Sequence, residues 1–281
     1  MYSLQPVPVD QNVTLLYITY LHNKGVSYST IQVYLSALRS LQVMAGFPEP
    51  DIRSPQVKLA LRAVQHNTAP PRQKCPIDYI LLCKMLQLIA LGTHKELWSA
   101  VLCLSFFAGL RGSEYTSQVI NGVQQYTKLS QVKIVQGDPD TIMYFTVPRS
   151  KTKVHGFSIP LGCTRVPVCP VCTMMSYLMR YSGNFAVLGD PPLFALSDGT
   201  PISKHMVNVK LKQLASALNL DPSSFSTHSI RAGAASTAAR LGFKDWEIKR
   251  LGGWSSSAYR QYIRDLDSHV AGFSARLTSQ P

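Results

Sequence analysis

Hydrophobic and polar positions in the first quarter of the chain repeat with the period of an α-helix. Three segments show the pattern, at about 9–23, 28–45 and 54–66. The middle one is the clearest, and the apolar side chains that fall on one of its faces are Ile31, Leu35, Leu38 and Leu41. The sequence therefore predicts a small helical unit, about as small as an independently folding unit can be.

A change of composition follows this unit. The stretch HNTAPPRQKCP (66–76) contains three prolines and has no apolar period. Such a stretch is typical of an interdomain linker. We therefore predict a helical domain over 1–68, a linker over 69–76 and a second domain over 77–281.

The second domain begins with two largely apolar segments, IDYILLCKMLQLIALG and ELWSAVLCLSFFAGL, which predict buried helices. The period then changes to two, around the turn clusters GDPD and RSKTK, which predicts antiparallel strands at about 131–136, 141–148 and 155–160. Helical patterns return at about 170–182, 202–218, 227–241, 244–251 and 256–264. The predicted fold class is mainly α with a small antiparallel β-sheet (α+β).

The charge of the chain narrows the choice of partner. Lys and Arg number 28 against 15 Asp and Glu, a formal net charge of +13 among 281 residues. Such an excess favours a polyanion, either nucleic acid or an anionic membrane surface. The longest apolar run, 97–110, is too short to span a bilayer, and no amphipathic segment has a lysine-rich face. We therefore expect nucleic acid and no membrane.

The cysteines and the N-terminus indicate the compartment. The N-terminal segment MYSLQPVPVDQN lacks the basic and apolar regions of a secretory signal, so we expect an intracellular protein with reduced thiols. Cys169 and Cys172 form CPVC, with Cys163 and His155 upstream. These residues could form a zinc site, but structural zinc usually shows a second closely spaced ligand pair. We therefore expect neither a metal nor a cofactor.

Four separate stretches carry residues with potential chemistry. Arg111 directly follows an apolar helix, where a guanidinium is costly to bury unless a partner such as Glu114 holds it. On a helix, His228 and Arg231 project from one face. The side chains of interest are Arg111 and Glu114 in RGSE, Lys151 and Lys153 in RSKTK, His228 and Arg231 in HSIR, and Trp254, Tyr259 and Tyr262 in GGWSSSAYRQYIR.

In this order, R-x-x-E, a hairpin lysine, H-x-x-R, G-W and a tyrosine in Y-I-R resemble the tyrosine recombinase (phage integrase) family. Cre-type members are the nearest match, through HSIRAGAAS, GGW and YIRDLDS. The likeness covers about 100–281 strongly, and the helical region 9–66 is similar to a shortened core-binding domain of the family. GGWSSSAYRQYIR also resembles recombinases of DIRS-type or Crypton-type eukaryotic mobile elements, which would imply a nuclear protein.

The resemblance implies cleavage and rejoining of DNA through a covalent 3′-phosphotyrosyl intermediate, without metal or ATP. It makes Tyr262 the nucleophile, and Arg111 and Arg231 the pair that binds the phosphate. Bidentate guanidinium groups are suited to balancing charge on the non-bridging oxygens. The trailing IRDLDS aligns with the family only if the nucleophile is Tyr262, although Tyr259 lies one turn earlier and the interval after Trp254 is one residue shorter than in Cre-type enzymes.

The resemblance also implies the supporting roles. Lys151, with Lys153 as its competitor, would protonate the departing 5′-oxygen, and His228 would help to remove the tyrosine proton. Trp254 has only an indole N–H, so it can donate to the phosphate but cannot transfer protons. Glu114 would hold Arg111 in place.

The expected partner is double-stranded DNA. Candidate DNA contacts of the N-terminal domain are Arg39, Lys58 and Arg62. The segment 268–277 has an apolar stripe, Val270, Phe273 and Leu277, and the resemblance implies that it docks on a neighbouring copy in a tetramer on two DNA sites. Two other functions stay open: a type IB topoisomerase-like nicking and relaxing enzyme, and a catalytically inactive domesticated DNA-binding protein.

Overall fold

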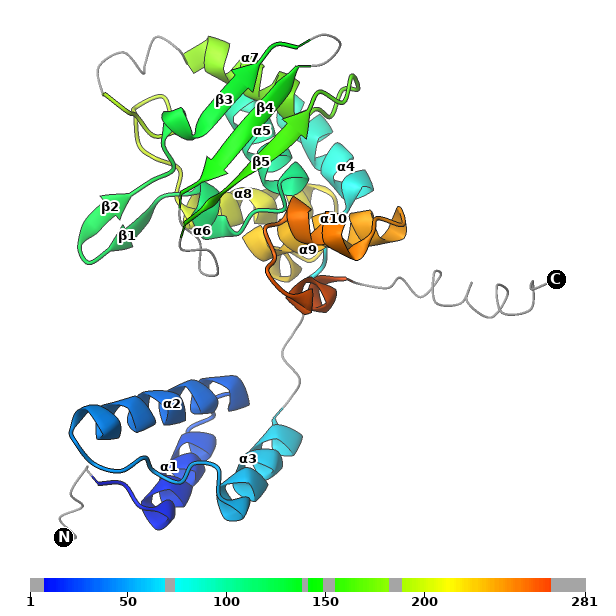
Figure 1. The fold of residues 1–281 in the computed structure, drawn as a ribbon. Helices are drawn as coiled ribbons and strands as arrows, with labels where there is room; N and C mark the ends of the chain where they lie inside the picture. Colours follow the sequence, from blue (N-terminus) through cyan, green and yellow to red (C-terminus); the bar gives the residue numbers. More distant parts are fainter. Residues whose placement is uncertain (1–7, 69–73, 138–140, 149–154, 182–188, 264–281) are drawn as a thin grey trace. The chain divides into compact units, whose positions relative to one another are not determined.

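A computed structural model describes residues 8–68, 74–137, 141–148, 155–181 and 189–263. The chain divides into two compact units, Met1–Arg72 and Gln73–Pro281 (Figure 1). The fold is α+β, as the sequence predicts. Within the described ranges, no helix combines the length and the apolar character needed to cross a membrane.

The first unit contains three helices, α1 (Gln11–Asn23), α2 (Tyr28–Met44) and α3 (Pro55–Asn67). Each begins at a polar cap whose side chain accepts a hydrogen bond from a backbone N–H of the first turn, namely Asp10, Ser27 and Ser54. The helices enclose one small apolar core, formed by Ile18, Leu21, Ile31, Leu35, Val57 and Val64. The three predicted helices are confirmed.

The predicted apolar face of α2 is wrong at its end. Leu41 is 56% exposed, and Gln42 takes the buried position beside it at 3%. The Gln42 amide accepts from the backbone N–H of Val9 and donates to the carbonyl of Pro48, both at 2.7 Å. Irregular chain covers this end of the helix, and its backbone groups need a polar partner that leucine cannot supply.

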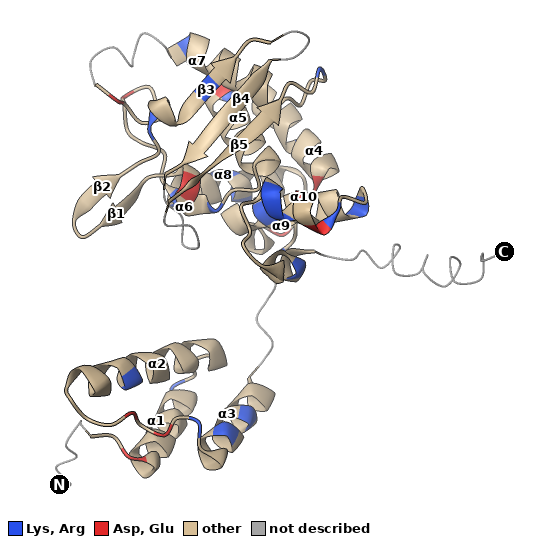
Figure 2. Ribbon diagram, in the orientation of Figure 1, with Lys and Arg blue, Asp and Glu red and all other residues tan. Residues whose placement is uncertain are grey.

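Basic side chains lie on α2 and α3 (Figure 2). Arg39 on α2 forms an ion pair with Glu49. Lys58 and Arg62 are exposed and one turn apart on α3, a helix whose sequence contains no acidic residue. The three predicted DNA contacts therefore differ in their surroundings: Arg39 forms an ion pair, whereas the described part of the chain places no acidic partner on Lys58 or Arg62.

The second unit is built around α5 (Lys95–Phe107), which is buried along most of its length. Around it pack α4 (Tyr79–Ala90), α7 (Pro170–Tyr181) and α9 (Thr227–Arg240). The remaining helices are α6 (Gly112–Tyr115), α8 (Lys204–Ala217) and α10 (Asp245–Leu251). Shorter 3-10 segments are η1 (Leu129–Gln131), η3 (Pro222–Ser224) and η4 (Ser257–Tyr262).

A three-stranded antiparallel sheet lies against these helices (Figure 1). Its order is β3 (Val132–Val135), β4 (Ile142–Val147) and β5 (Phe157–Gly162). Met143, Phe145 and Val147 of β4 face the core, while Tyr144 between them is 37% exposed. This alternation is the period of two that predicts the strands, and the three predicted strands are confirmed.

A second sheet was not expected from the sequence. It is a hairpin of β1 (Gln118–Ile120) and β2 (Val123–Gln125), joined at Asn121 and Gly122. Both turn residues have positive φ, 51° and 76°, as a type I′ turn requires. All six strand residues are exposed, so the hairpin has no buried face whose alternation could have predicted it.

Close packing explains the small residues of α9. An added Cβ at Gly233 would lie 1.7 Å from the carbonyl oxygen of Ile77. The backbone N–H of Ile77 donates to the carbonyl of Ser229 at 2.9 Å, and that of Cys75 to Ser224 at 2.8 Å. Residues 74–77 therefore run directly along the second unit, and the last part of the predicted linker is packed against it.

Candidate active site

The centre of the site is a buried arginine. Arg231, on α9, is 1% exposed. Its Nη1 donates to the carbonyl of Gly109, and its Cζ lies 3.9 Å from the ring centroid of Trp254. Within the described ranges, its Nε and Nη2 have no hydrogen-bond partner. A buried guanidinium with two unused donors is costly, so this position favours an acceptor brought by a ligand.

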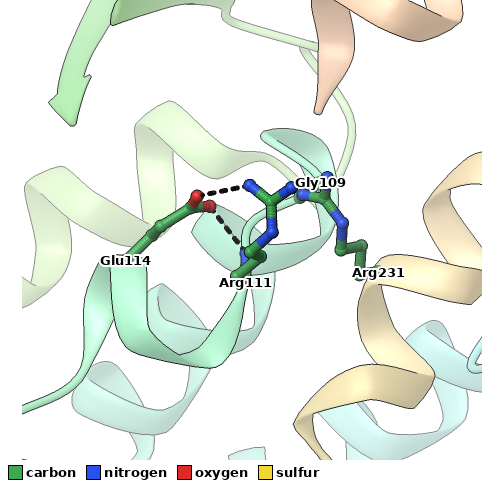
Figure 3. Close-up of polar contacts among 4 residues, drawn as sticks. All are labelled: Gly109, Arg111, Glu114 and Arg231. Atoms are coloured by element: carbon green, nitrogen blue, oxygen red, sulfur yellow. Dashed lines mark hydrogen bonds and ion pairs between the residues drawn. The ribbon is translucent and has the colours of Figure 1, made fainter. Parts of the chain in front are cut away.

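A second arginine lies beside the first. Arg111 follows the α5 segment and caps α6, where Glu114 Oε2 accepts from its backbone N–H at 2.8 Å. Glu114 Oε1 also accepts from Arg111 Nη1 at 2.9 Å, and the carboxylate is buried. Figure 3 shows the guanidinium groups of Arg111 and Arg231 side by side near Gly109. The predicted pairing of Arg111 with Glu114 is present.

The electrostatics of this pair favour an anion. Burial, and then the like charge of Arg111, lower the pKa of Arg231 to about 10. Arg231 is therefore still protonated at neutral pH, and the negative charge of Glu114 opposes the shift. The site contains two guanidinium charges and one carboxylate, that of Glu114. It therefore has a net positive charge in a partly desolvated environment. A phosphate with several oxygens would satisfy both the charge and the unused donors.

Tyr262 lies against this pair. Its ring centroid is 4.9 Å from that of His228 and 5.9 Å from that of Trp254, and 5.7 Å from Arg231 Cζ. The carbonyl of Tyr262 accepts from Ser236 Oγ at 3.0 Å. Helix α9 thus supplies three contacts to the segment that carries the tyrosine, of which the sequence predicted two.

Tyr259 occupies a different environment. It is 4% exposed, and its hydroxyl donates to Asp245 on α10. The same carboxylate forms ion pairs with Lys249 at 2.5 Å and Arg260 at 3.6 Å. The Tyr259 hydroxyl therefore has a structural partner, whereas Tyr262 lies with His228 and Arg231. This arrangement agrees with the preference for Tyr262, which stays a prediction.

The segment before Tyr262 is a 3-10 helix, not the α-helix predicted over 256–264. In a 3-10 helix, side chains three residues apart eclipse. Tyr259 and Tyr262 therefore both turn toward Trp254, with ring centroids 6.1 Å and 5.9 Å from it. The prediction was wrong because tertiary contacts with α9 and α10 override the helical pattern in so short a segment.

The two glycines directly before Trp254 have no room for a side chain. A Cβ at Gly252 would lie 2.1 Å from the Trp254 ring, and one at Gly253 would lie 2.5 Å from the ring of Phe157. Gly253 also has φ of +64°, which favours glycine. Trp254 is 5% exposed, and its Nε1 has no hydrogen-bond partner among the described residues. That N–H is a further unused donor in the site.

The remaining predicted residues lie elsewhere. Lys151 and Lys153 fall outside the described residues, between β4 and β5 in the sequence, so the assignment of a general acid stays a prediction. Arg39, Lys58 and Arg62 belong to the first unit. The roles of the Gly109 carbonyl, Ser236 and Asp245 could not be predicted from the sequence, because backbone acceptors and contacts between distant segments follow no spacing rule.

One cluster of possible metal ligands occurs in the described part of the chain. Cys163, Cys169 and Cys172 place their sulfur atoms within 4.8 Å of one another. None of the residues around Arg231 belongs to it, and neither does His155, the further candidate ligand in the sequence.

Comparison with solved structures shows which known fold this chain has. No protein-family model matches the chain, and no curated protein matches it. The integrase of transposon Tn1549, solved with circular intermediate DNA, is 16% identical, with a TM-score of 0.60 over 99% of this chain and 87% of that one. The XerH recombinase in a post-cleavage complex with palindromic difH is 11% identical, with a TM-score of 0.64 over 97% and 73%.

A lambda integrase dimer bound to a COC′ core site is 17% identical, with a TM-score of 0.55 over 92% of this chain and 65% of that one. At such identities the likeness concerns the fold alone. The TM-scores of 0.55 to 0.64 show that this chain shares the fold of all three proteins. This protein therefore has the fold of the tyrosine recombinases.

Proposed function

We propose that this protein is a DNA recombinase or integrase that cleaves and rejoins strands through a covalent phosphotyrosine at Tyr262. The observation that carries the proposal is the gathering of Arg111, Arg231 and Tyr262 at one place, with unused donors on a buried guanidinium. This arrangement suits a phosphodiester. Few other ligands would supply both the negative charge and the acceptor oxygens that the unused donors require.

In the proposed reaction, the non-bridging oxygens accept from Arg111, Arg231 and the indole N–H of Trp254. The Tyr262 oxygen attacks phosphorus, the bond to the 5′-oxygen breaks, and a 3′-phosphotyrosyl ester forms. His228 takes up the tyrosine proton, and Lys151 gives a proton to the 5′-oxygen. The phosphoester is kept in the intermediate, so the reverse attack by a 5′-hydroxyl rejoins the strand without ATP.

The comparisons support DNA as the substrate. The Tn1549 integrase, XerH and lambda integrase structures all hold DNA, and the XerH complex is in a post-cleavage state. The net charge of +13 suits the same polyanion. We extend the substrate of those proteins to this chain because its residues form a site that suits a phosphodiester.

The test is a trapping experiment. The protein is mixed with supercoiled plasmid and with a library of linear duplexes of randomised sequence, with and without EDTA, and is then denatured in detergent. We expect a covalent adduct that protease removes, in equal yield with EDTA. Sequencing the trapped DNA would identify the target. Binding without any adduct would instead favour an inactive DNA-binding protein, and relaxation without exchange between two sites would favour a topoisomerase-like enzyme.

We propose that Lys58 and Arg62 on α3 contact DNA phosphates. Affinity should fall by roughly a thousandfold between about 50 and 200 mM salt if several phosphates are contacted. Replacing both Lys58 and Arg62 with Ala should reduce the slope of log K against log salt by about 2, since each phosphate contact contributes about 0.9. Gln56→Ala, an exposed neutral change on the same helix, is the matched control and should leave the slope unchanged.

We further propose that the protein acts as a tetramer, joined by residues 268–277. These residues lie outside the described ranges, and the proposal rests on their apolar stripe and on the resemblance. Truncation after Asp267 should leave the melting temperature and binding to a single site unchanged, but abolish complexes that hold two sites. If the truncated monomer instead melts several degrees lower, the segment packs on its own domain.

A further inference from the structure

Three cysteines that play no part in the proposed reaction converge where β5 joins α7. Cys163 directly follows β5, whereas Cys169 and Cys172 lie at the start of α7, on either side of Pro170 and Val171. The Cys163 sulfur lies 3.6 Å from that of Cys172 and 3.7 Å from that of Cys169. All three sulfur atoms are within 4.8 Å of one another.

These separations suit ligands of one small metal ion. A tetrahedral zinc ion with Zn–S bonds of about 2.3 Å holds its sulfur atoms about 3.8 Å apart. A disulfide requires about 2.05 Å, and the cysteines are all unbridged in the structure. Two of the three sulfur pairs, at 3.6 and 3.7 Å, therefore have the spacing of a zinc site.

The backbone around Cys169 also favours a thiolate. The N–H groups of Thr164 and Cys172 both point to Cys169 Sγ, each at 3.4 Å. Three thiolates at such short range would repel one another strongly, so a cation is needed before all of them can ionise together.

We propose that Cys163, Cys169 and Cys172 bind one zinc ion, with a solvent molecule as the fourth ligand. Purely sulfur ligands select a soft or borderline cation over magnesium or calcium. In the described part of the chain, no other His, Cys, Asp or Glu joins the group. Cys172 is exposed, so the fourth position is open to water.

The ion would have a structural role. Cys163 and Cys169 lie at the two ends of the segment 164–168, so one ion fixes both ends and ties the sheet to α7. Thr164, Val166 and Val168 of this segment line an apolar cavity of about 510 Å³, whose lining also includes Ala238 and Leu241 at the end of α9. The metal would therefore fix the position of the segment that contributes these three residues to the cavity.

The experiment uses the full chain, purified under reducing conditions with zinc in the medium. We expect one zinc per chain by elemental analysis, and a thiolate-to-metal charge-transfer absorption when cobalt replaces it. Cys172→Ser should lose the zinc and melt on the order of 10 °C lower. Cys172→His should retain zinc, because imidazole is also a zinc ligand. Cys75→Ser and Cys83→Ser are matched controls outside the cluster and should retain it.

Cys172 is exposed, so its serine variant is expected to fold, which circular dichroism would verify. Its yield of DNA adduct per folded molecule should equal that of the unaltered protein, so this test is independent of the proposed reaction. The proposal is overturned if zinc is absent, if Cys172→Ser holds as much zinc as Cys75→Ser, or if mass analysis finds a disulfide between Cys163 and Cys172 in place of the metal.

Discussion

Tyr262→Phe should abolish the covalent DNA adduct and leave DNA affinity within about twofold. The change removes only the hydroxyl, and the phenyl ring keeps its contacts with His228 and Trp254. Without that oxygen no phosphoester can form, so the expected loss is complete, not partial. The measurement is adduct yield on denaturing gels, beside affinity from a binding titration on the same DNA.

Tyr259→Phe is the matched control. It should retain the adduct but lose the hydrogen bond to Asp245, which lowers the free energy of unfolding by about 1–3 kcal/mol. The two substitutions are therefore expected to have different effects: Tyr262→Phe removes the chemistry, and Tyr259→Phe lowers the stability. An adduct that survives in Tyr262→Phe and disappears in Tyr259→Phe would show that the roles are reversed.

Arg231→Ala should slow adduct formation by roughly 10³-fold or more. Removing a single neutral donor to a developing oxyanion costs about 3–4 kcal/mol in well-studied enzymes, and Arg231 offers two donors and a full charge. Single-turnover rates at saturating DNA would measure the effect. Arg231→Lys should recover only part of the rate, because an ammonium is a point charge and cannot replace the planar fork that also reaches the Gly109 carbonyl.

A loss of folding has to be distinguished from this loss of rate. Arg111→Ala leaves the buried Glu114 carboxylate without its partner, so it should lower both the rate and the melting temperature. Adding Glu114→Gln should restore the melting temperature and leave the rate low. If the double variant regained its rate, Arg111 would be a structural residue and not a phosphate ligand.

Much of the second unit could be predicted because its apolar and polar residues alternate regularly over long segments. The three strands follow from the alternation around β4, and the face shared by His228 and Arg231 follows from helical spacing. The resemblance then implies a role for each of these residues at a single phosphate. Sequence spacing could place these residues on their elements, but it could not show that Arg231 is buried beneath Trp254.

The rest depends on contacts between distant segments. Asp245 separates the roles of Tyr259 and Tyr262, but it lies fourteen residues before the first of them in the sequence. The exposed hairpin at Asn121–Gly122 has a turn signal without a buried face. The cysteines lack the second closely spaced ligand pair that is usual in a zinc site, so their spacing in the sequence is only a weak signal. The fold brings Cys163 close to Cys169 and Cys172, which the sequence could not show.

The packing of Gly233 against the carbonyl of Ile77 restricts where this protein can be re-engineered. Helix α9 carries Arg231 on one side and has no space for even a methyl group on the other, so randomising its small residues would mostly yield unfolded variants. Exposed positions on α3 have no such restriction. A library placed there would retain the fold, so that selection would act on the altered surface alone.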